Sequence, residues 1–175
     1  MLELNNIKNS LETFAKEVRK QARTNLTKKN HNVTKELYNS VDYELEVHRN
    51  SYSLRFLMED YADFLDKGVS GTQIKYNTPY SYKSNSNVLG FELATGTFAK
   101  WAKFRNIRFR NEKGQFKKGN YKSIGVAIAL AKKKKGMKPT EFFTKPLNNA
   151  FKNLPKDIID AFALDVSNII TDKYE

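Results

Sequence analysis

The first pattern along the chain has a helical period. Apolar side chains recur at steps of four, three, four and four residues, at Ile7, Leu11, Phe14, Val18 and Ala22. Because an α-helix turns once in 3.6 residues, this spacing gathers them on one face. The pattern predicts an amphipathic helix of about 20 residues, ending near the polar run at residues 27–32, whose apolar face packs on a core.

The second pattern has a period of two. Apolar residues take every second position from Val41 to Val47 and again from Tyr52 to Met58, with a short polar segment at residues 48–51 between the two stretches. Alternation of this kind is typical of a strand with one face toward the core. The two stretches therefore predict an antiparallel hairpin with one buried face.

A short helix is predicted next, at residues 60–68. Tyr61, Phe64 and Leu65 share one face at helical spacing. Asp60 is placed to cap the first turn. Gly68 is placed to end the helix in the left-handed conformation that glycine adopts readily.

Residues 69–90 show no sustained periodicity. They contain Gly, Pro, Ser and Asn together with Tyr76, Tyr80 and Tyr82. A loop this long is uncommon inside a small domain and tends to be functional. The tyrosines are candidate anchors of a partner interface, because tyrosine offers a large contact area at low entropic cost. The alternative is that they hold the loop against its own domain.

Residues 98–120 mix aromatic residues with cations. Phe98, Trp101 and Phe104 have helical spacing, whereas Ile107 and Phe109 alternate with arginines in a predicted strand arm that runs into a turn at residues 111–115. Single-stranded nucleic-acid binders use such mixtures, since bases stack on rings while cations follow the phosphates. A half-buried element with a basic outer face has the same pattern, and the sequence lacks the signature of an RNA-recognition motif.

A further helix is predicted at residues 121–135, where Ile124, Ala127, Ile128 and Ala131 have helical spacing. Gly136 is a suitable helix stop. The four lysines before it suit the negative end of the helix dipole.

Beyond these lysines, Thr140 is an expected cap and Pro146 an expected break. A final amphipathic helix follows, and its predicted apolar stripe consists of Ile158, Ile159, Phe162, Val166, Ile169 and Ile170.

These elements predict an α+β protein. We expect a single domain of residues 1–175, in which an antiparallel sheet packs against a long N-terminal helix and a C-terminal helix, with residues 69–120 as an extended loop and basic arm. The absence of cysteine excludes disulfides and thiolate metal sites. No signal-peptide pattern occurs and no run approaches the roughly 20 apolar residues of a membrane span, so no membrane association is expected.

The formal net charge of +12 is concentrated in one segment. Between Phe98 and Lys138 there are 14 Lys and Arg and one acid, Glu112, so this segment carries +13 and the rest of the chain about −1. Such a block fits contact with phosphates, contact with an acidic protein surface, or a solvated face. The residues expected to meet DNA or an acidic partner are Arg105, Arg108, Arg110, Lys117, Lys118, Lys132, Lys133, Lys134 and Lys135.

Catalytic and metal chemistry have little support. No dinucleotide-binding, phosphate-loop or nucleophile-elbow motif occurs. His31 and His48 lie in polar segments without metalloprotease spacing or a third ligand. Asp60, Asp63 and Asp66 suggest a metal, but their spacing is that of ordinary exposed helix acids. We therefore expect no enzyme, no cofactor and no metal.

Four pieces of the sequence occur in a characteristic order. They are the N-terminal amphipathic helix, VTKELYNSV before the hairpin, DYADFLDKGVSGT after it, and GMKPTEFFTKPLNNAF before the long last helix. In this order the chain resembles the small head-tail joining proteins of tailed bacteriophages, also called neck or tail-completion proteins. The resemblance covers most of the chain. Two departures are Asp66, where many members have glutamate, and residues 70–120, which are longer than in compact members.

The resemblance implies a structural virion protein, assembled in the cytoplasm of a bacterial host. Its copies would form a ring, a hexamer or dodecamer, around the DNA channel between the portal or adaptor and the tail. A cyclic ring needs two different, complementary patches on each copy. We expect the strand acids Asp42, Glu44 and Glu46 to meet the basic segment of a neighbour.

The loop at residues 69–90 and the arm at residues 105–118 are the parts expected to reach adjacent rings, and to order on assembly. The alternative to a neck protein is a stand-alone basic protein that binds nucleic acid.

Overall fold

The structure is a computed structural model that describes residues 4–29, 34–49, 51–117 and 119–171. The chain forms two compact units: residues 1–62 with 141–175 are the first, and residues 63–140 are the second. The chain thus enters the second unit once and returns once. Two compact units can still unfold together as one domain, so the predicted single domain stays a prediction.

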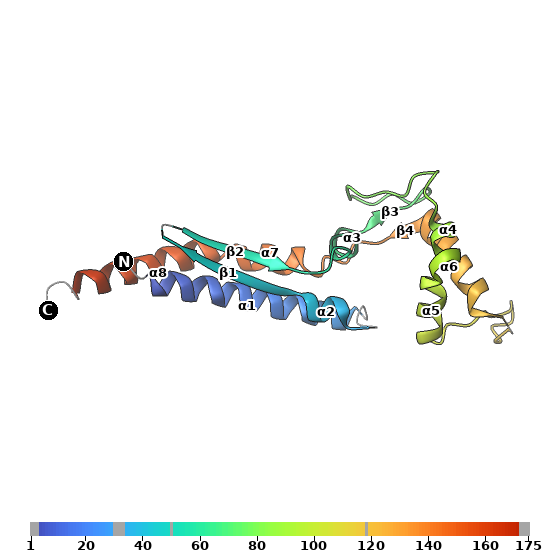
Figure 1. Cartoon of the computed structure of the whole chain (residues 1–175), viewed down its shortest axis with the longest axis horizontal. Coiled ribbons are helices and arrows are strands. Elements are labelled where there is room, and N and C mark those ends of the chain that lie inside the picture. Colours follow the sequence, from blue (N-terminus) through green and yellow to red (C-terminus); the bar gives the residue numbers. More distant parts are fainter. Residues whose placement is uncertain (1–3, 30–33, 50, 118, 172–175) are drawn as a thin grey trace. The chain divides into compact units, whose positions relative to one another are not determined.

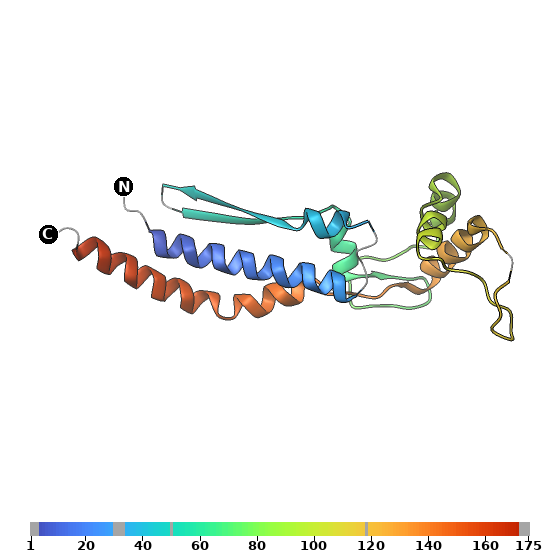
Figure 2. The same cartoon turned by 90° about the horizontal axis from the view of Figure 1, so that it is seen from below.

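The first unit is built around one long helix. This helix contacts both the β-hairpin and the C-terminal helices, and Figures 1 and 2 show it running beside the last helix. The elements of the unit are α1 (Asn5–Lys28), α2 (Glu36–Ser40), β1 (Asp42–His48), β2 (Ser51–Leu57), α7 (Thr144–Phe151) and α8 (Leu154–Thr171).

The core of the first unit follows the predicted patterns. The apolar stripe of α1 is buried at Ile7, Phe14, Val18 and Ala22, which confirms the predicted N-terminal helix. The strands β1 and β2 pair antiparallel, and Tyr43 lies opposite Phe56. The Phe56 ring lies edge-on to Phe14 and to Phe143, with centroids 6.3 and 5.2 Å apart. The hairpin is therefore confirmed, and its inner face is fixed to the helices by aromatic packing.

A buried carboxylate from α8 caps the start of α1. Leu4, at the N-cap position, provides no side-chain hydrogen bond. Instead Asp165, which is 3% exposed, accepts hydrogen bonds from the backbone N–H groups of Asn6 (3.0 Å) and Ile7 (3.1 Å) and from the Asn6 amide (2.8 Å). A carboxylate at this position satisfies donors that lack intrahelical partners and complements the helix dipole.

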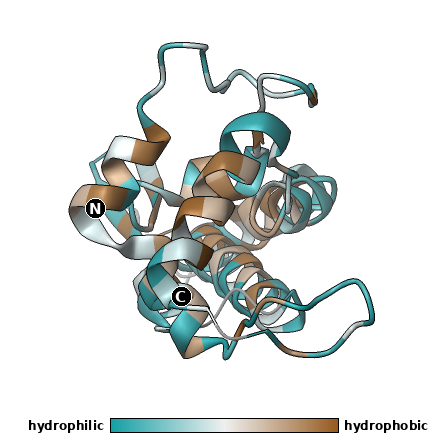
Figure 3. Cartoon of the chain, turned by 90° about the vertical axis from the view of Figure 1, so that its right-hand side faces the viewer, coloured by the Kyte–Doolittle hydropathy of each residue, from teal (hydrophilic) through white to brown (hydrophobic). Residues whose placement is uncertain are grey.

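The predicted stripe of α8 is only partly correct. Ile158, Val166 and Ile169 are half-buried, but Ile159 and Phe162 are exposed, while Ala161 and Asp165 are buried. The buried side of α8 differs from the predicted stripe because Asp165, which caps α1, faces inward. Apolar and polar segments alternate around the helices of the chain, as Figure 3 shows.

The second unit contains helices and a very short sheet. Its elements are α3 (Ala62–Lys67) from Asp63 onward, β3 (Val69–Ser70), α4 (Val88–Thr95), α5 (Thr97–Phe104), α6 (Tyr121–Lys135) and β4 (Gly136–Met137). Residues 69–120 are thus not a loop throughout, because they include α4 and α5. The helices α4 and α5 both contact α6.

A second buried carboxylate caps α5. Glu92, on α4, accepts hydrogen bonds from the N–H groups of Phe98 (2.7 Å) and Ala99 (2.9 Å). A Cβ atom on Gly125 of α6 would lie 2.1 Å from a carboxylate oxygen of Glu92. The packed face of α6 therefore centres on Ile124, Gly125 and Ala129, whereas the predicted positions Ala127 and Ala131 are exposed.

The fold class is confirmed: the chain is α+β, with a long N-terminal helix, C-terminal helices and small antiparallel two-stranded sheets. Pro146 does not break a helix as predicted. It lies buried in the first turn of α7, where its missing N–H would have had no intrahelical partner. Within the described residues, no helix is long and apolar enough to cross a membrane.

We predict that Asp165→Asn lowers the free energy of unfolding by about 1–3 kcal/mol, because an amide NH₂ replaces one of the two accepting oxygens and the negative charge that complements the helix dipole is lost. Urea unfolding of the full chain measures this loss. Asp160→Asn, at an exposed position of the same helix, is the control and should change the midpoint little. Equal effects of the two substitutions would contradict the capping role.

Candidate functional site

Two of the sequence pieces behind the resemblance, residues 60–72 and 136–151, meet in the small sheet of the second unit. Val69 pairs with Met137 and Ser70 with Gly136, antiparallel. Next to this sheet, the Thr140 hydroxyl donates a 2.7 Å hydrogen bond to the carbonyl oxygen of Leu65. Thr140 therefore fastens the returning segment to α3 and does not cap a helix as predicted. We call this pairing the β3–β4 junction.

Glycine makes the junction possible. Gly136 ends α6 at φ +76° and ψ −160°, a conformation that is essentially restricted to glycine. A Cβ atom there would lie 2.1 Å from the carbonyl oxygen of Val69, and a Cβ atom on Gly71 would lie 2.1 Å from that of Lys134. Gly68, at φ +74°, takes the predicted helix-ending conformation. The two backbones thus approach more closely than side chains allow.

The loop after β3 is held by its own unit. The N–H of buried Ser70 donates to the carbonyl oxygen of Tyr80, and the Ser70 carbonyl accepts from the N–H of Tyr82, both at 2.8 Å. The Ser70 hydroxyl accepts from the N–H of Tyr76 at 2.9 Å and donates to its carbonyl at 3.2 Å. Ser70 is therefore the centre around which residues 70–82 fold.

The candidate anchor tyrosines are half-buried in this arrangement. The Tyr80 hydroxyl donates to Asp63, and its ring lies 4.5 Å from that of Phe64 between centroids. Hydrogen bonds from Lys67 and Tyr80 hold the pKa of Asp63 below its ordinary value. Burial raises the pKa of Tyr82. Their role in a partner interface stays a prediction.

The four lysines at residues 132–135, here called the tetralysine segment, also hold the loop through their backbone. The carbonyl oxygen of Lys133 accepts from the N–H of Thr72, and that of Lys134 accepts from the N–H of Gln73, both at 2.9 Å. The Lys133 ammonium donates to the carbonyl of Ser84 at 2.7 Å. Burial lowers the pKa of the Lys132 ammonium. Lys134 and Lys135 are exposed, so these two lysines present their charge to solvent.

The acids of β1 are paired within their own unit. Arg19 donates to Asp42 at 2.7 Å, and this hydrogen bond, with a second from the N–H of Tyr43, holds the pKa of Asp42 below 3.8. Arg55, across the hairpin, forms ion pairs with Glu46 and, at 3.8 Å, with Glu44. The predicted acidic face is therefore largely balanced by arginines, and its contact with a neighbouring copy stays a prediction.

The basic arm folds back on itself. Arg110 and Phe116 form an antiparallel bridge, and the intervening turn is closed by a 2.9 Å hydrogen bond from the N–H of Asn111 to the carbonyl of Gln115. Arg105, Arg108, Arg110 and Lys117 are exposed. Lys118 lies outside the described residues.

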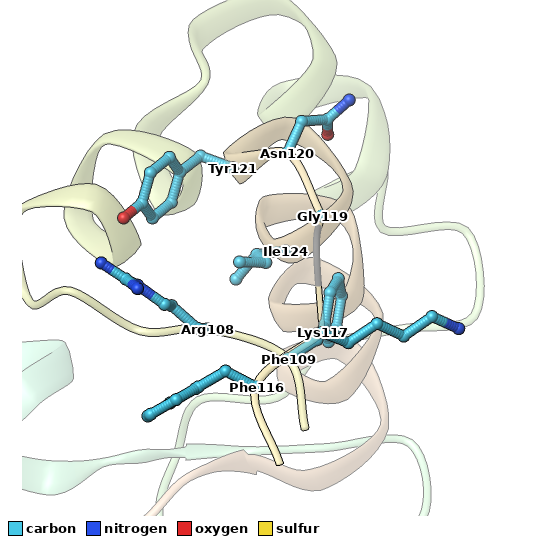
Figure 4. A pocket seen from close by; sticks show the side chains of 8 residues that line it. All are labelled: Arg108, Phe109, Phe116, Lys117, Gly119, Asn120, Tyr121 and Ile124. Atoms are coloured by element: carbon cyan, nitrogen blue, oxygen red, sulfur yellow. The ribbon is translucent and has the colours of Figure 1, made fainter. Parts of the chain in front are cut away.

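A hollow of about 690 Å³ lies between this arm and the start of α6. In Figure 4 the Arg108 and Tyr121 side chains extend toward the same space, with Ile124 behind it. Its lining includes Arg108, Phe109, Phe116, Lys117, Tyr121 and Ile124.

The net charge of the second unit slightly exceeds that of the whole chain. Residues 63–140 contain 17 Lys and Arg and four Asp and Glu, a net charge of +13 against +12 for the whole chain. Asp66 and Glu92 are buried and Asp63 is hydrogen-bonded, which leaves Glu112 as the fourth acid, exposed in the arm. The surface of this unit is therefore cationic with little interruption, unlike the mixed surface of an ordinary solvated face.

Sequence reasoning missed a second row of cations, on α1. Lys16, Lys20, Arg23 and Lys28 line an open hollow on the polar side of this helix. Their spacing of three to five residues, near the helical repeat, was the available signal. This row does not appear in the net charge, because acids elsewhere in the first unit compensate these cations.

Among the residues with described positions, no three His, Asp or Glu side chains gather closely enough to hold a metal ion. Asp66 is 4% exposed, so the expectation of an ordinary exposed acid was wrong there. The reason is that α3 buries Ala62 and Asp66, one turn apart, and exposes Phe64.

Comparison with known proteins adds no assignment: no family model, no curated protein and no solved structure matches the chain.

We predict that Gly136→Ala lowers the free energy of unfolding by more than about 3 kcal/mol, because its Cβ meets the backbone of β3 in addition to a strained φ. Hydrogen exchange at Ser70, Thr72 and Gln73 should accelerate. Gly114→Ala is the matched control, since Gly114 also has a positive φ but open space around it, and it should cost about 1 kcal/mol. Equal losses would contradict a packed junction.

We also predict a pH-dependent effect of Asp42→Asn. The pKa of Asp42 is lower in the folded than in the unfolded state, so its contribution is present above pH 3.8 and is lost as the pH falls through the folded pKa. Because both partners are partly exposed, the substitution should cost less than about 1 kcal/mol at neutral pH. Urea midpoints along a descending pH series measure it, with exposed Glu59→Gln as control. A difference that persists in strong acid would refute the pairing.

Proposed function

We propose that this chain is a structural protein of a tailed bacteriophage that joins head to tail in the virion neck. In this role, copies form a ring around the DNA channel and contact the portal or adaptor on one side and tail proteins on the other. The second unit turns its cationic surface toward the packaged DNA.

The observation that carries the proposal is the β3–β4 junction. The motif segments at residues 60–72 and 136–151, distant in sequence, were part of the resemblance to neck proteins. In the structure their adjoining ends pair, and Gly68, Gly71 and Gly136 permit this pairing. The close approach of the two backbones requires glycine in both motifs, which is a physical reason for the motifs to occur together. This reason supports the resemblance independently of the match in residue types.

Two further observations support assembly. The charge is divided between the units, +13 in residues 63–140 and about −1 elsewhere, so that a copy offers unlike surfaces, as a cyclic ring requires. On α8, Ile159 and Phe162 are exposed apolar side chains three residues apart, on one side of the helix. Exposed apolar side chains in groups are typical of surfaces that are covered in assemblies.

A second candidate function is favoured by the charge itself. A unit of 78 residues with four acids against 17 cations fits a stand-alone protein that binds nucleic acid through phosphates. The two candidates differ in where the chain resides: a neck protein stays in the purified particle, whereas a free binding protein does not.

We predict that a phage carrying a stop codon in this gene produces DNA-filled heads and complete tails that do not join. Purified chain added to the lysate should restore joined, infectious particles. Negative-stain microscopy and plaque titre measure both effects, with Glu59→Gln protein as an active control. Normal titre without the chain, or its absence from purified particles, would refute the neck assignment; nucleic-acid binding together with that absence would favour the second candidate.

A further inference from the structure

The hollow beside the basic arm combines two kinds of recognition group. Its walls carry the rings of Phe109, Phe116 and Tyr121 and the guanidinium group of Arg108, while the Lys117 side chain extends to the opposite side (Figure 4). Among the described residues that line it there is no Asp or Glu. Its volume of about 690 Å³ is within the range of pockets that hold small organic groups. The groove thus suits a ligand that is both planar and anionic.

Phe116 is the most accessible of the ring surfaces. Its side chain is 63% exposed, and the guanidinium groups of Arg110 and Arg108 lie 4.6 and 5.8 Å from its ring centroid. These cation–π contacts place both guanidinium groups beside the ring. A planar group that stacks on Phe116 therefore meets positive charge at once.

Phe109 forms a fixed wall instead. It is less exposed than Phe116, and a Cβ atom on Gly119 would lie 2.9 Å from its ring. The arm is therefore seated against the segment that leads into α6. A stacking surface on such a seated element is preorganised, which reduces the entropy lost on binding.

We propose that this groove binds single-stranded DNA, with a base stacked on Phe116 and the adjoining phosphates on Arg108 and Arg110. An unpaired base exposes its face to a ring, whereas the bases of a duplex are stacked on one another and do not. An acidic protein segment would pair with the cations but would leave the rings without planar partners. The inference goes beyond the proposed role in the neck, because its ligand is a single strand, and it does not depend on the ring.

The test is fluorescence anisotropy of the full-length chain with a labelled oligodeoxythymidylate of about 15 nucleotides and with a duplex of equal length. The single strand should bind more tightly than the duplex. Phe116→Leu keeps the charge and removes the ring, and it should weaken single-strand binding by about 5- to 150-fold, the effect of losing one stacked base. Phe116→Trp should restore the affinity, since the larger ring stacks as well.

The charge control is Lys113→Gln, in the turn of the arm. It should weaken single-strand and duplex binding by the same small factor, because it removes a phosphate attraction without touching the groove. Circular dichroism checks that each variant is folded.

Three outcomes would overturn the inference: duplex bound as tightly as single strand, single-strand affinity unchanged within twofold in Phe116→Leu, or binding of polyglutamate in preference to both DNAs. Each leaves the neck assignment standing if the chain is still required for joined particles.

Discussion

Close approach of two backbones at the β3–β4 junction is the constraint on which the second unit depends. The carbonyl oxygens of Val69 and Lys134 lie where a Cβ atom of Gly136 or Gly71 would be, so glycine is required on both sides. The same junction positions Ser70, which organises the loop that follows, and it places the end of α6 so that its carbonyls accept hydrogen bonds from that loop. The tetralysine segment is thus structural through its backbone and electrostatic through part of its side chains.

Charge is organised differently in the two units. In the first unit, Asp42 and Glu46 form ion pairs with Arg19 and Arg55, Glu12 pairs with Lys16 along α1, and Asp165 accepts hydrogen bonds at the start of α1. In the second, the buried or bonded acids leave the cations of the arm and of α6 with little compensation. Repulsion between like charges costs stability, which a protein tolerates where a polyanion is the partner. The proposed contact with DNA accounts for this imbalance, and a mixed, solvated surface does not.

Periodic patterns predicted the long helices and the hairpin, because these depend on the local repeat of each element, but they did not predict α2 and α4. The N-terminal helix and the hairpin were found in this way, whereas the end of α6 was predicted from Gly136 as a helix stop. Features that depend on partners distant in sequence were missed: Asp165 capping α1 across more than 150 residues, Asp66 turned inward, and Thr140 bound to α3. In the candidate site, the list of cations followed from composition. The groove did not, because it depends on Phe109 seating against Gly119 and on the turn that returns Phe116 to Arg110.

Electron cryomicroscopy of the purified particle is the most direct measurement of the account. It should show density for this chain repeated with cyclic symmetry between head and tail, with residues 105–117 and 132–135 facing the DNA channel. A neck without this chain, or a ring in which those cationic segments face away from DNA toward the outer solvent, would contradict the central claim that the cationic unit serves to contact DNA.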